Sequence, residues 1–322
     1  MPPVSVNLHS ESLRHHFAHQ QGFDIFGLIE LARAQGFDGV NIATDGPGFK
    51  HLGGTDSGHF ANVRDALVAN ELAVELHTSD TRPQPLHLLL EVASALGADG
   101  LRTYTRHRGT PHDMLERTVA DLRIAAERAE ITGVRILLGN REDFLTHELA
   151  EIVQRVGSKF VHALFDYGNS QVLGEDPLAA LQALLPFVDG ADVKDQLIIS
   201  DAGQLRVQGV ATGEGKLPIE EITRRLHAAG CQRFCFTSAW SLVSPLSARA
   251  TVLPESPCFV VQADSVLVDG ARLDPESAVE GERLSLQRGW NWFNAVLAVI
   301  TGTSRFVLDD WNDLDKAVPG SN

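Results

Sequence analysis

The stretch VRILLGNREDFLTHEL, residues 134–149, joins a strand pattern, a polar cluster and the start of a helix. The apolar run over 134–138 predicts a buried strand, and the run ends abruptly at Gly139. Asn140, Arg141 and Glu142 follow at once, and a helical pattern begins near Thr146. Polar side chains at the carboxyl end of a buried strand often carry the chemistry of α/β proteins. The sequence therefore raises the question of why a glycine stands at this strand end.

The same succession of apolar run and helical pattern recurs along the chain. Strands are predicted over 4–8, 39–43, 73–76, 100–105, 134–138, 160–165, 190–194 and 233–237. Helices are predicted over 24–35, 58–70, 86–96, 111–131, 147–156, 176–187 and 218–230. Repeated units of this kind need parallel strands, and around a closed sheet they form a (β/α)8 TIM barrel. An open doubly wound sheet is the alternative, but no GxGxxG pattern follows an early strand.

Two segments do not fit the repeat. Residues 195–217 alternate like a β-hairpin around DAGQ. Residues 241–322 contain proline-rich turns and then an amphipathic helical pattern over 282–300 with Trp290, Trp292 and Phe293. We expect a barrel over 1–240 and a C-terminal extension over 241–322. Its helix should pack on the barrel or on the partner of a homodimer, and a substrate lid is a further alternative.

The composition narrows the class of protein. The chain has 322 residues, of which 43% are hydrophobic and 21% charged, as in globular enzymes. A net charge of −15 argues against nucleic-acid binding, which relies on lysine and arginine. No apolar run is long enough to span a membrane, and the N-terminus does not resemble a signal peptide. Three cysteines at unpaired spacings predict reduced thiols in a cytoplasmic protein.

The carboxyl ends of the predicted strands give the candidate site residues. They are Asn7, His9, Glu75, His77, Arg102, Tyr104, Gly139, Arg141, Asp166, Asp192, Lys194 and Thr237, joined by Asn140, Glu142 and Trp240 from the segments that follow. Asp166 and Asp192 should face each other from adjacent strands, where like charges raise a carboxyl pKa. That arrangement favours acid–base work or cation binding. Alternatively, Lys194 neutralises the pair in a purely structural role.

Three further stretches carry a resemblance to a known family. GNREDFLTHELAEIVQRVGS, ALFDYGNSQVLGEDPLAAL and GADVKD resemble the xylose isomerase-like TIM barrel superfamily of sugar isomerases and epimerases. GEGKLPIEEI resembles the loop and helix before the last strand of that family. The similarity covers roughly residues 4 to 240. It implies a TIM barrel with a divalent metal held by Glu, Asp, His and Glu, the two glutamates also moving the proton.

The family's metal ligands can be carried over one at a time. The first glutamate begins a Glu-Asn-His-x-Asp stretch, where this chain has Gly139, and the histidine of that stretch is Arg141. The aspartate is retained as Asp166 in FDYGN. The metal-binding histidine precedes a Lys-Asp pair, and here it is Asp192 in DVKD. The last glutamate is replaced by Thr237. The resemblance thus implies that Gly139 stands where a metal-binding glutamate is usual.

The favoured hypothesis is an enzyme of this barrel superfamily that works without the metal. Asp166 or Asp192 would be the base, and His9, His77, Tyr104 or Lys194 the acid or oxyanion stabiliser. Isomerisation, dehydration and cyclisation of a small molecule in a biosynthetic pathway fit this description. One alternative is a sugar isomerase or epimerase with Mg²⁺ or Mn²⁺ at Asp166 and Asp192, helped by Glu142 and a histidine. Another is a non-catalytic binding protein. The arginines at 102, 106, 108 and 141 favour an anionic ligand or balance the acidic groups.

Overall fold

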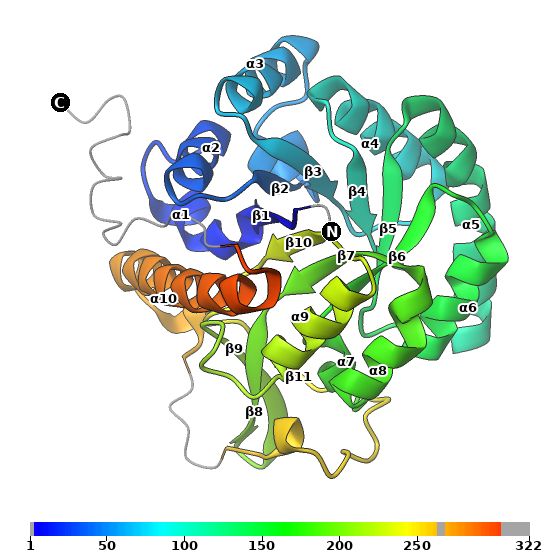
Figure 1. The fold of residues 1–322 in the computed structure, drawn as a ribbon, viewed down its shortest axis with the longest axis vertical. Coiled ribbons are helices and arrows are strands. Elements are labelled where there is room, and N and C mark those ends of the chain that lie inside the picture. Colours follow the sequence, from blue (N-terminus) through cyan, green and yellow to red (C-terminus); the bar gives the residue numbers. More distant parts are fainter. Residues whose placement is uncertain (1–2, 263–267, 304–322) are drawn as a thin grey trace.

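A computed structural model describes residues 3–262 and 268–303 and shows a closed barrel of eight parallel strands (Figure 1). The order around the barrel is β1-β10-β7-β6-β5-β4-β3-β2. The strands are β1 (Ser5–His9), β2 (Gly39–Ala43), β3 (Ala73–His77), β4 (Gly100–Thr103), β5 (Arg135–Gly139), β6 (Val161–Asp166), β7 (Val188–Val193) and β10 (Arg233–Phe236). The predicted (β/α)8 fold is confirmed, and the open-sheet alternative is wrong.

Helices follow the strands on the outside of the barrel (Figure 1). The helices between successive barrel strands are α1 (Arg14–His19), α2 (Ile25–Ala34), α3 (Ser57–Ala69), α4 (Pro83–Leu96), α5 (Pro111–Thr132), α6 (Thr146–Val156), α7 (Asn169–Val172), α8 (Pro177–Leu184) and α9 (Ile219–Ala228). Gly97, Gly133 and Gly157 end their helices with a φ between 66° and 79°. Glycine accepts this left-handed conformation without strain, so each chain can turn sharply into the next strand.

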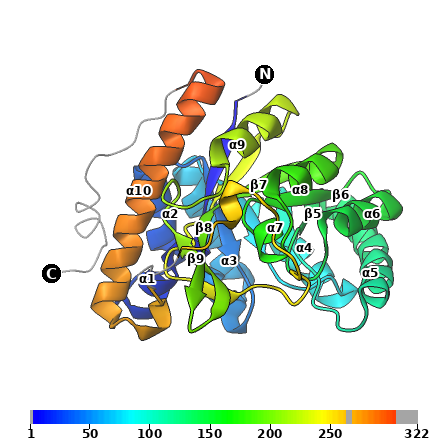
Figure 2. The ribbon, with the colours of Figure 1, turned by 90° about the horizontal axis from the view of Figure 1, so that it is seen from below.

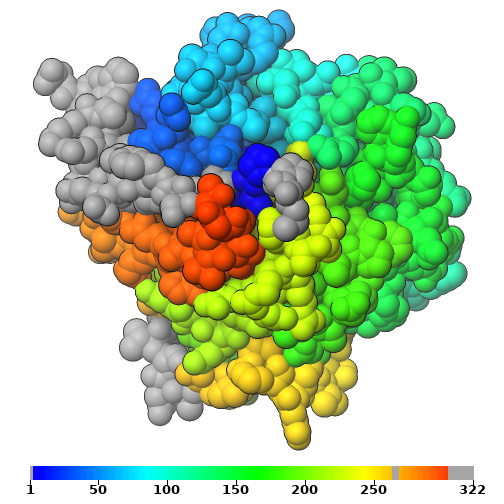
Figure 3. All heavy atoms as spheres, viewed as in Figure 1, coloured from blue at the N-terminus to red at the C-terminus, as the bar shows by residue number. Residues whose placement is uncertain are grey.

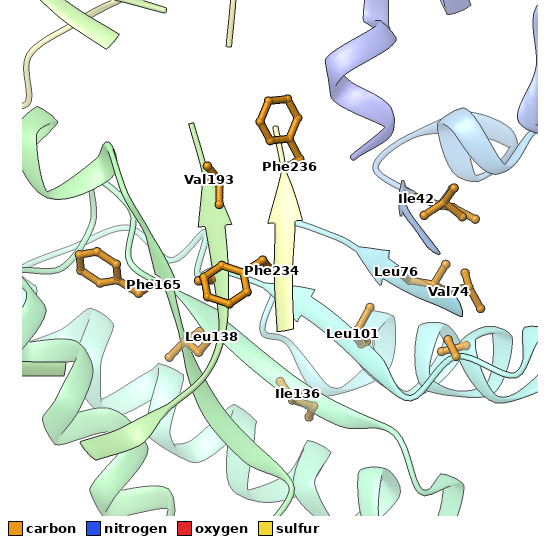
Figure 4. Close-up of a cluster of buried hydrophobic side chains, with 14 of the residues drawn as sticks. Ile42, Val74, Leu76, Leu101, Ile136, Leu138, Phe165, Val193, Phe234 and Phe236 are labelled. Atoms are coloured by element: carbon orange, nitrogen blue, oxygen red, sulfur yellow. The ribbon is translucent and has the colours of Figure 1, made fainter. Parts of the chain in front are cut away.

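Strand residues alternate between the helix layer and the barrel interior. Figure 4 shows residues of the helix-facing set, among them Ile42, Leu76 and Phe236, which pack in one hydrophobic core. The residues between them are mostly polar and point inward. Asn41 donates to Glu75 at 3.1 Å, and Arg102 pairs with Asp192 across the barrel. The outer core therefore holds the fold together, while the interior is left for polar groups.

The predicted hairpin is also confirmed. Strands β8 (Asp195–Asp201) and β9 (Gln204–Val210) pair antiparallel, and β11 (Val243–Pro245) joins β9 to make a three-stranded sheet. Ala202 and Gly203 both have positive φ, as the tight turn of a two-residue hairpin requires. Asp195 holds the hairpin's return loop by accepting backbone N–H groups from Gly213 and Gly215, each at 2.9 Å. The sheet stands beside the barrel (Figure 2).

The C-terminal helix α10 (Pro275–Thr301) begins earlier than the predicted 282 and packs on the barrel. Figures 1 and 3 show it against the barrel, between the N-terminal helices and α9. The Trp290 ring stacks on Phe37 with centroids 3.9 Å apart, and its N–H donates to the Gln35 carbonyl at 2.8 Å. Helix α10 therefore takes the place of the eighth outer helix. The predicted domain boundary at residue 240 would separate α10 from the barrel on which it packs. Residues 263–267 and 304–322 of the predicted extension lie outside the described residues.

Candidate active site

A cavity of about 620 Å³ opens at the carboxyl ends of the barrel strands. The predicted residues that line it are His9, His77, Tyr104, Arg141, Glu142, Asp166, Asp192, Lys194 and Thr237. Because the strands are parallel and the barrel is closed, residues far apart in the sequence meet at this end. The structure thus brings together most of the polar strand ends that the sequence singles out.

Asp192, at the end of β7, has both carboxylate oxygens engaged. Arg102 donates to Oδ2 and the Thr237 hydroxyl donates to Oδ1, both at 2.5 Å. Burial disfavours the ionised form, but Arg102 and the hydrogen bond from Thr237 outweigh it and hold the pKa of Asp192 below its ordinary value. Asp192 therefore has a donor on each oxygen and a lowered pKa, which make it a poor base.

Asp166, its neighbour on β6, is held differently. Its Oδ1 lies 3.0 Å from Lys194 Nζ and accepts the backbone N–H groups of Gly168 and Asn169. Among the described residues, none donates a hydrogen bond to Oδ2. Burial raises the pKa of Asp166, Lys194 lowers it and Asp192 raises it, with a net increase. A carboxylate with one open oxygen and a raised pKa is suited to accept a proton.

The two histidines at the ends of β1 and β3 form a directed pair. The Glu11 backbone N–H donates to His9 Nδ1 at 3.0 Å, which leaves the proton of a neutral imidazole on Nε2. That Nε2–H faces His77 Nδ1 at 2.7 Å, so His77 in turn carries its proton on Nε2. Burial first, with Arg102 adding to it, lowers the pKa of both histidines well below the ordinary value. His77 is thus a neutral N–H donor at the cavity, not a base.

Tyr104 forms a platform at the rim between the ends of β4 and β5. The guanidinium carbon of Arg141 lies 4.2 Å from the ring centroid and that of Arg106 lies 4.6 Å from it. Arg106 also donates to the Tyr104 hydroxyl at 2.7 Å. Contact with the aromatic ring holds both cations at the cavity edge.

Five predicted substrate-binding residues do not line the cavity: Asn7, Glu75, Arg102, Asn140 and Trp240. Glu75 lies nearer the amino ends of the strands, where Arg233 donates to it at 2.6 Å, and Asn7 is buried at the level of Gly39. They lie outside the cavity because each strand offers several inward positions, and those nearer the amino end do not open into it.

Of the other three residues, Arg102 and Asn140 support the site from behind, and Trp240 lies away from it. Arg102 is buried behind Asp192. The Asn140 side chain makes two hydrogen bonds with the Asp166 backbone, at 2.6 and 3.1 Å, and so fixes that carboxylate in place. The Trp240 ring lies against Gly281 of α10. Arg102 and Asn140 therefore position the two carboxylates, while Trp240 fastens α10.

Several lining residues were missed by the sequence analysis. Polar ones are Glu11, Asp45, Lys50, Ser79, Asn169 and Gln196, and apolar ones are Val172, Val207, Leu242, Val243 and Leu246. Most lie in loops or in the hairpin sheet, where no strand periodicity marks the inward positions. Asn169 could have been found from the sequence, because it belongs to the FDYGN stretch that carries the family resemblance. Its side chain accepts a hydrogen bond from Lys194 at 2.7 Å.

Comparison with known proteins places this geometry in a family. A family model for the xylose isomerase-like TIM barrel matches residues 29–242, most of the barrel. The chain therefore belongs to the xylose isomerase-like TIM barrel family. The fold, the strand order and the position of the cavity agree with that membership.

Similar individual proteins agree on the fold. A xylose isomerase domain protein from Planctomyces limnophilus has a TM-score of 0.64 and 13% identity, covering 94% of this chain and 100% of the other. A D-psicose 3-epimerase from Clostridium cellulolyticum H10 has a TM-score of 0.61 and 14% identity, covering 88% and 98%. The uncharacterized protein YihM of Escherichia coli is 26% identical over 204 residues. The matched stretch spans 63% of this chain and 62% of YihM.

The divalent metal that the family resemblance implies does not fit the donor set. Lys194 and Arg102 already place positive charges against Asp166 and Asp192. Within residues 3–262 and 268–303, no group of three or more His, Cys, Asp and Glu side chains is arranged to hold a metal ion. The relocated set of Asp166, Asp192, Glu142 and a histidine is therefore not assembled. A divalent ion favours several free carboxylate or imidazole ligands.

Two smaller expectations concern cysteines and membranes. Cys231, Cys235 and Cys258 are buried and form no disulfide. No helix in the described part of the chain is both long and apolar enough to cross a bilayer.

Proposed function

We propose that this protein is an enzyme that moves a proton on a small, oxygen-rich molecule without a divalent metal. The observation that supports it is the pairing of both inner carboxylates with cations of the chain, Lys194 with Asp166 and Arg102 with Asp192. These two basic side chains supply the positive charge that a metal supplies in the family pattern. Isomerisation next to a carbonyl is the reaction class that fits best, and dehydration or cyclisation can start from the same step.

Asp166 is the base in this proposal. Its open Oδ2 takes a proton from the hydroxyl-bearing carbon next to the substrate carbonyl. The electron pair of that C–H bond forms a C=C bond, and the π pair of the carbonyl moves to its oxygen. The proton of the neighbouring hydroxyl then moves to this oxygen, and the proton on Asp166, or one exchanged with solvent, returns to the former carbonyl carbon, which completes an isomerisation with no other reactant. Asn140 and the two backbone N–H groups on Oδ1 hold the carboxylate in one orientation.

His77 stabilises the oxyanion that forms. Its neutral Nε2–H is fixed as a donor by the chain of hydrogen bonds from the Glu11 backbone through His9. A neutral imidazole N–H can donate a hydrogen bond to a developing oxyanion while keeping its proton. Lys194, which also lines the cavity, adds a positive charge beside Asp166.

The test combines a metal assay with isotope exchange. Protein purified without chelators is assayed for metal, treated with EDTA, and incubated in D2O with a panel of ketoses, aldoses and 2-keto acids. We expect NMR to show deuterium uptake next to a carbonyl that persists with EDTA and disappears in Asp166→Asn. Glu142→Gln, which changes another cavity carboxylate, is the matched control and should keep the exchange.

The two alternative functions predict different results. Exchange that needs added Mg²⁺ or Mn²⁺ would contradict the proposal and favour a metal-dependent isomerase with relocated ligands. Absence of exchange, together with retained binding of a sugar-like ligand, would favour a non-catalytic binding protein.

A further inference from the structure

The cavity has one cationic wall, at the ends of β4 and β5. Arg141 and Arg106 both lie against the Tyr104 ring, with their guanidinium carbons 4.2 and 4.6 Å from its centroid. Lys50, Lys194 and Arg141 each have a carboxylate partner, which is Glu11, Asp166 and Glu142 respectively, whereas Arg106 has none among the described residues. Two arginines on one aromatic ring, one of them without a carboxylate partner, are therefore the unusual charge feature of this site.

These two arginines keep donors available. Among the described residues, no carboxylate lies within ion-pair distance of Arg106. Arg141 Nε lies 3.1 Å from Glu142 Oε2, but it has no hydrogen bond, and the terminal nitrogens of Arg141 have no described acceptor. Asp143 is a second carboxyl in the same loop, and burial, together with the charge of Glu142, raises its pKa. Glu142 and Asp143 limit the net positive charge without occupying the guanidinium faces.

Another part of the cavity lining is apolar. It consists of Val207 from β9, Leu242 and Val243 at β11, and Leu246. Leu242 leaves 49% of its surface exposed, although it lines a cavity in which it could be covered by a ligand. The wall follows β7 and β10 in the chain, and around the closed barrel β10 lies opposite β4. Leu242 and Val243, which follow β10, therefore lie on the side of the barrel away from the cationic platform.

We infer that the substrate is an amphipathic acid, with a carboxylate or phosphate at one end and an apolar group at the other. The anion would bind the guanidinium groups of Arg141 and Arg106, which match the fork geometry of such oxygens. The apolar group would cover Leu242 and Val243. The part between them would lie over Asp166 and His77, and only this last placement rests on the proposed function. A cavity of about 620 Å³ is large enough for a drug-sized ligand.

Four matched probes separate the two ends of such a ligand. Phenyl β-D-glucuronide and phenyl β-D-glucoside 6-phosphate carry both features, and they distinguish a carboxylate site from a phosphate site. Phenyl β-D-glucoside lacks the anion, and D-glucuronate lacks the apolar group. Titration calorimetry should show that at least one of the phenyl acids binds about tenfold or more tightly than either single-feature probe.

Variants assign the two ends to the two walls. Arg141→Gln and Arg106→Gln should remove the preference for the acids and leave phenyl glucoside binding unchanged. Arg108→Gln, an exposed arginine of the same loop as Arg106, is the matched control and should bind like the wild type. Leu242→Ser should weaken only the probes with a phenyl group. These side chains lie at the surface of the cavity, and circular dichroism confirms that each variant is folded.

Several results would overturn the inference. They are equal binding of the neutral glucoside and the acids, absence of binding by all four probes, and acid binding that survives both arginine substitutions. Failure of the proposed function looks different: a wild type that prefers the acids, but exchanges no deuterium with the ketoses, aldoses and 2-keto acids, retains this inference while losing the catalytic one.

Discussion

The barrel interior contains two networks of carboxylates and basic groups, one at each end, and they differ in what they leave open. At the amino ends of the strands, Arg233 pairs with Glu75 and Asp99, and Arg135 pairs with Asp99 and Asp189. At the carboxyl ends, Arg102 pairs with Asp192 and Lys194 with Asp166. Both networks balance charge inside a protein, where unpaired charge is costly.

In the network at the amino ends, which we call the lower network, the oxygens of Glu75 and Asp99 all have hydrogen-bond donors. Glu75 accepts from Arg233 at one oxygen and from Asn41 at the other, and Asp99 receives Arg233 at both oxygens. The network at the carboxyl ends, which we call the upper network, is open. Asp166 Oδ2 and His77 Nε2 have no hydrogen-bond partner among the described residues, and both residues line the cavity. A closed network serves stability, while open polar atoms at a cavity are available to a ligand. Charge alone does not distinguish the two ends. The carboxylate oxygens do, because those of Glu75 and Asp99 all have donors while Asp166 Oδ2 has none among the described residues.

The largest expected effect comes from Asp166→Asn in the open network. Removal of the base should lower the catalytic rate by about a thousandfold, since general bases contribute about 10² to 10⁴. The unfolding free energy should hold or rise, because the substitution removes the burial of a charge and its repulsion from Asp192, which together outweigh the attraction to Lys194. Steady-state kinetics on the substrate found by deuterium exchange, together with urea unfolding, measure both. A similar loss of rate and stability together would indicate a structural role instead.

Arg233→Met should break the closed network with the opposite result. The substitution leaves the buried Glu75 with Asn41 as its one remaining partner. Loss of one partner of a buried ion pair should lower the unfolding free energy by about 3 kcal/mol, at the low end of the range because 21% of the Arg233 side chain is exposed. Urea unfolding measures this loss. Arg135→Met, whose ion pairs are more exposed, should cost under about 1 kcal/mol. Phenyl glucuronide binding by the folded fraction should be unchanged, and weakened binding would contradict the division into two networks.

The difference between the networks also shows what the sequence could predict. Periodicity predicted the barrel, the hairpin and the inward set of polar residues, because alternation and strand length are local properties. It could not separate Glu75 from His77, which lie on the same face of β3, because depth along the barrel depends on closure and register. The apolar wall was not predicted, since Leu242 and Leu246 lie outside the barrel strands. Nor could sequence assign Asp166 rather than Asp192 as the base, which depends on hydrogen bonds from Thr237 and Arg102.

Lys194→Met sharpens the comparison through pH. Lys194 opposes the increase of the Asp166 pKa, so its removal should raise that pKa further and move the acid limb of the activity profile to higher pH. An acid whose pKa is raised by folding destabilises the fold as pH rises through the folded pKa, since the ionised form is the costly one. The variant should therefore lose about 2 kcal/mol at about pH 8 and less at about pH 5. Equal losses in urea unfolding at both values would mean that Lys194 acts by packing alone.

Gly139→Ala should have the smallest effect. A Cβ at this position would lie 3.6 Å from Leu164 Cδ2 and 3.6 Å from the Thr103 carbonyl, which are ordinary contacts, and Gly139 does not have a positive φ. Replacement of a glycine whose backbone suits alanine stabilises by about 0.4 to 1 kcal/mol, so thermal and urea unfolding should show no loss. A clear loss would mean that the barrel itself requires the glycine. The expected tolerance would mean that neither the backbone conformation nor the space for a Cβ requires a glycine at the end of β5.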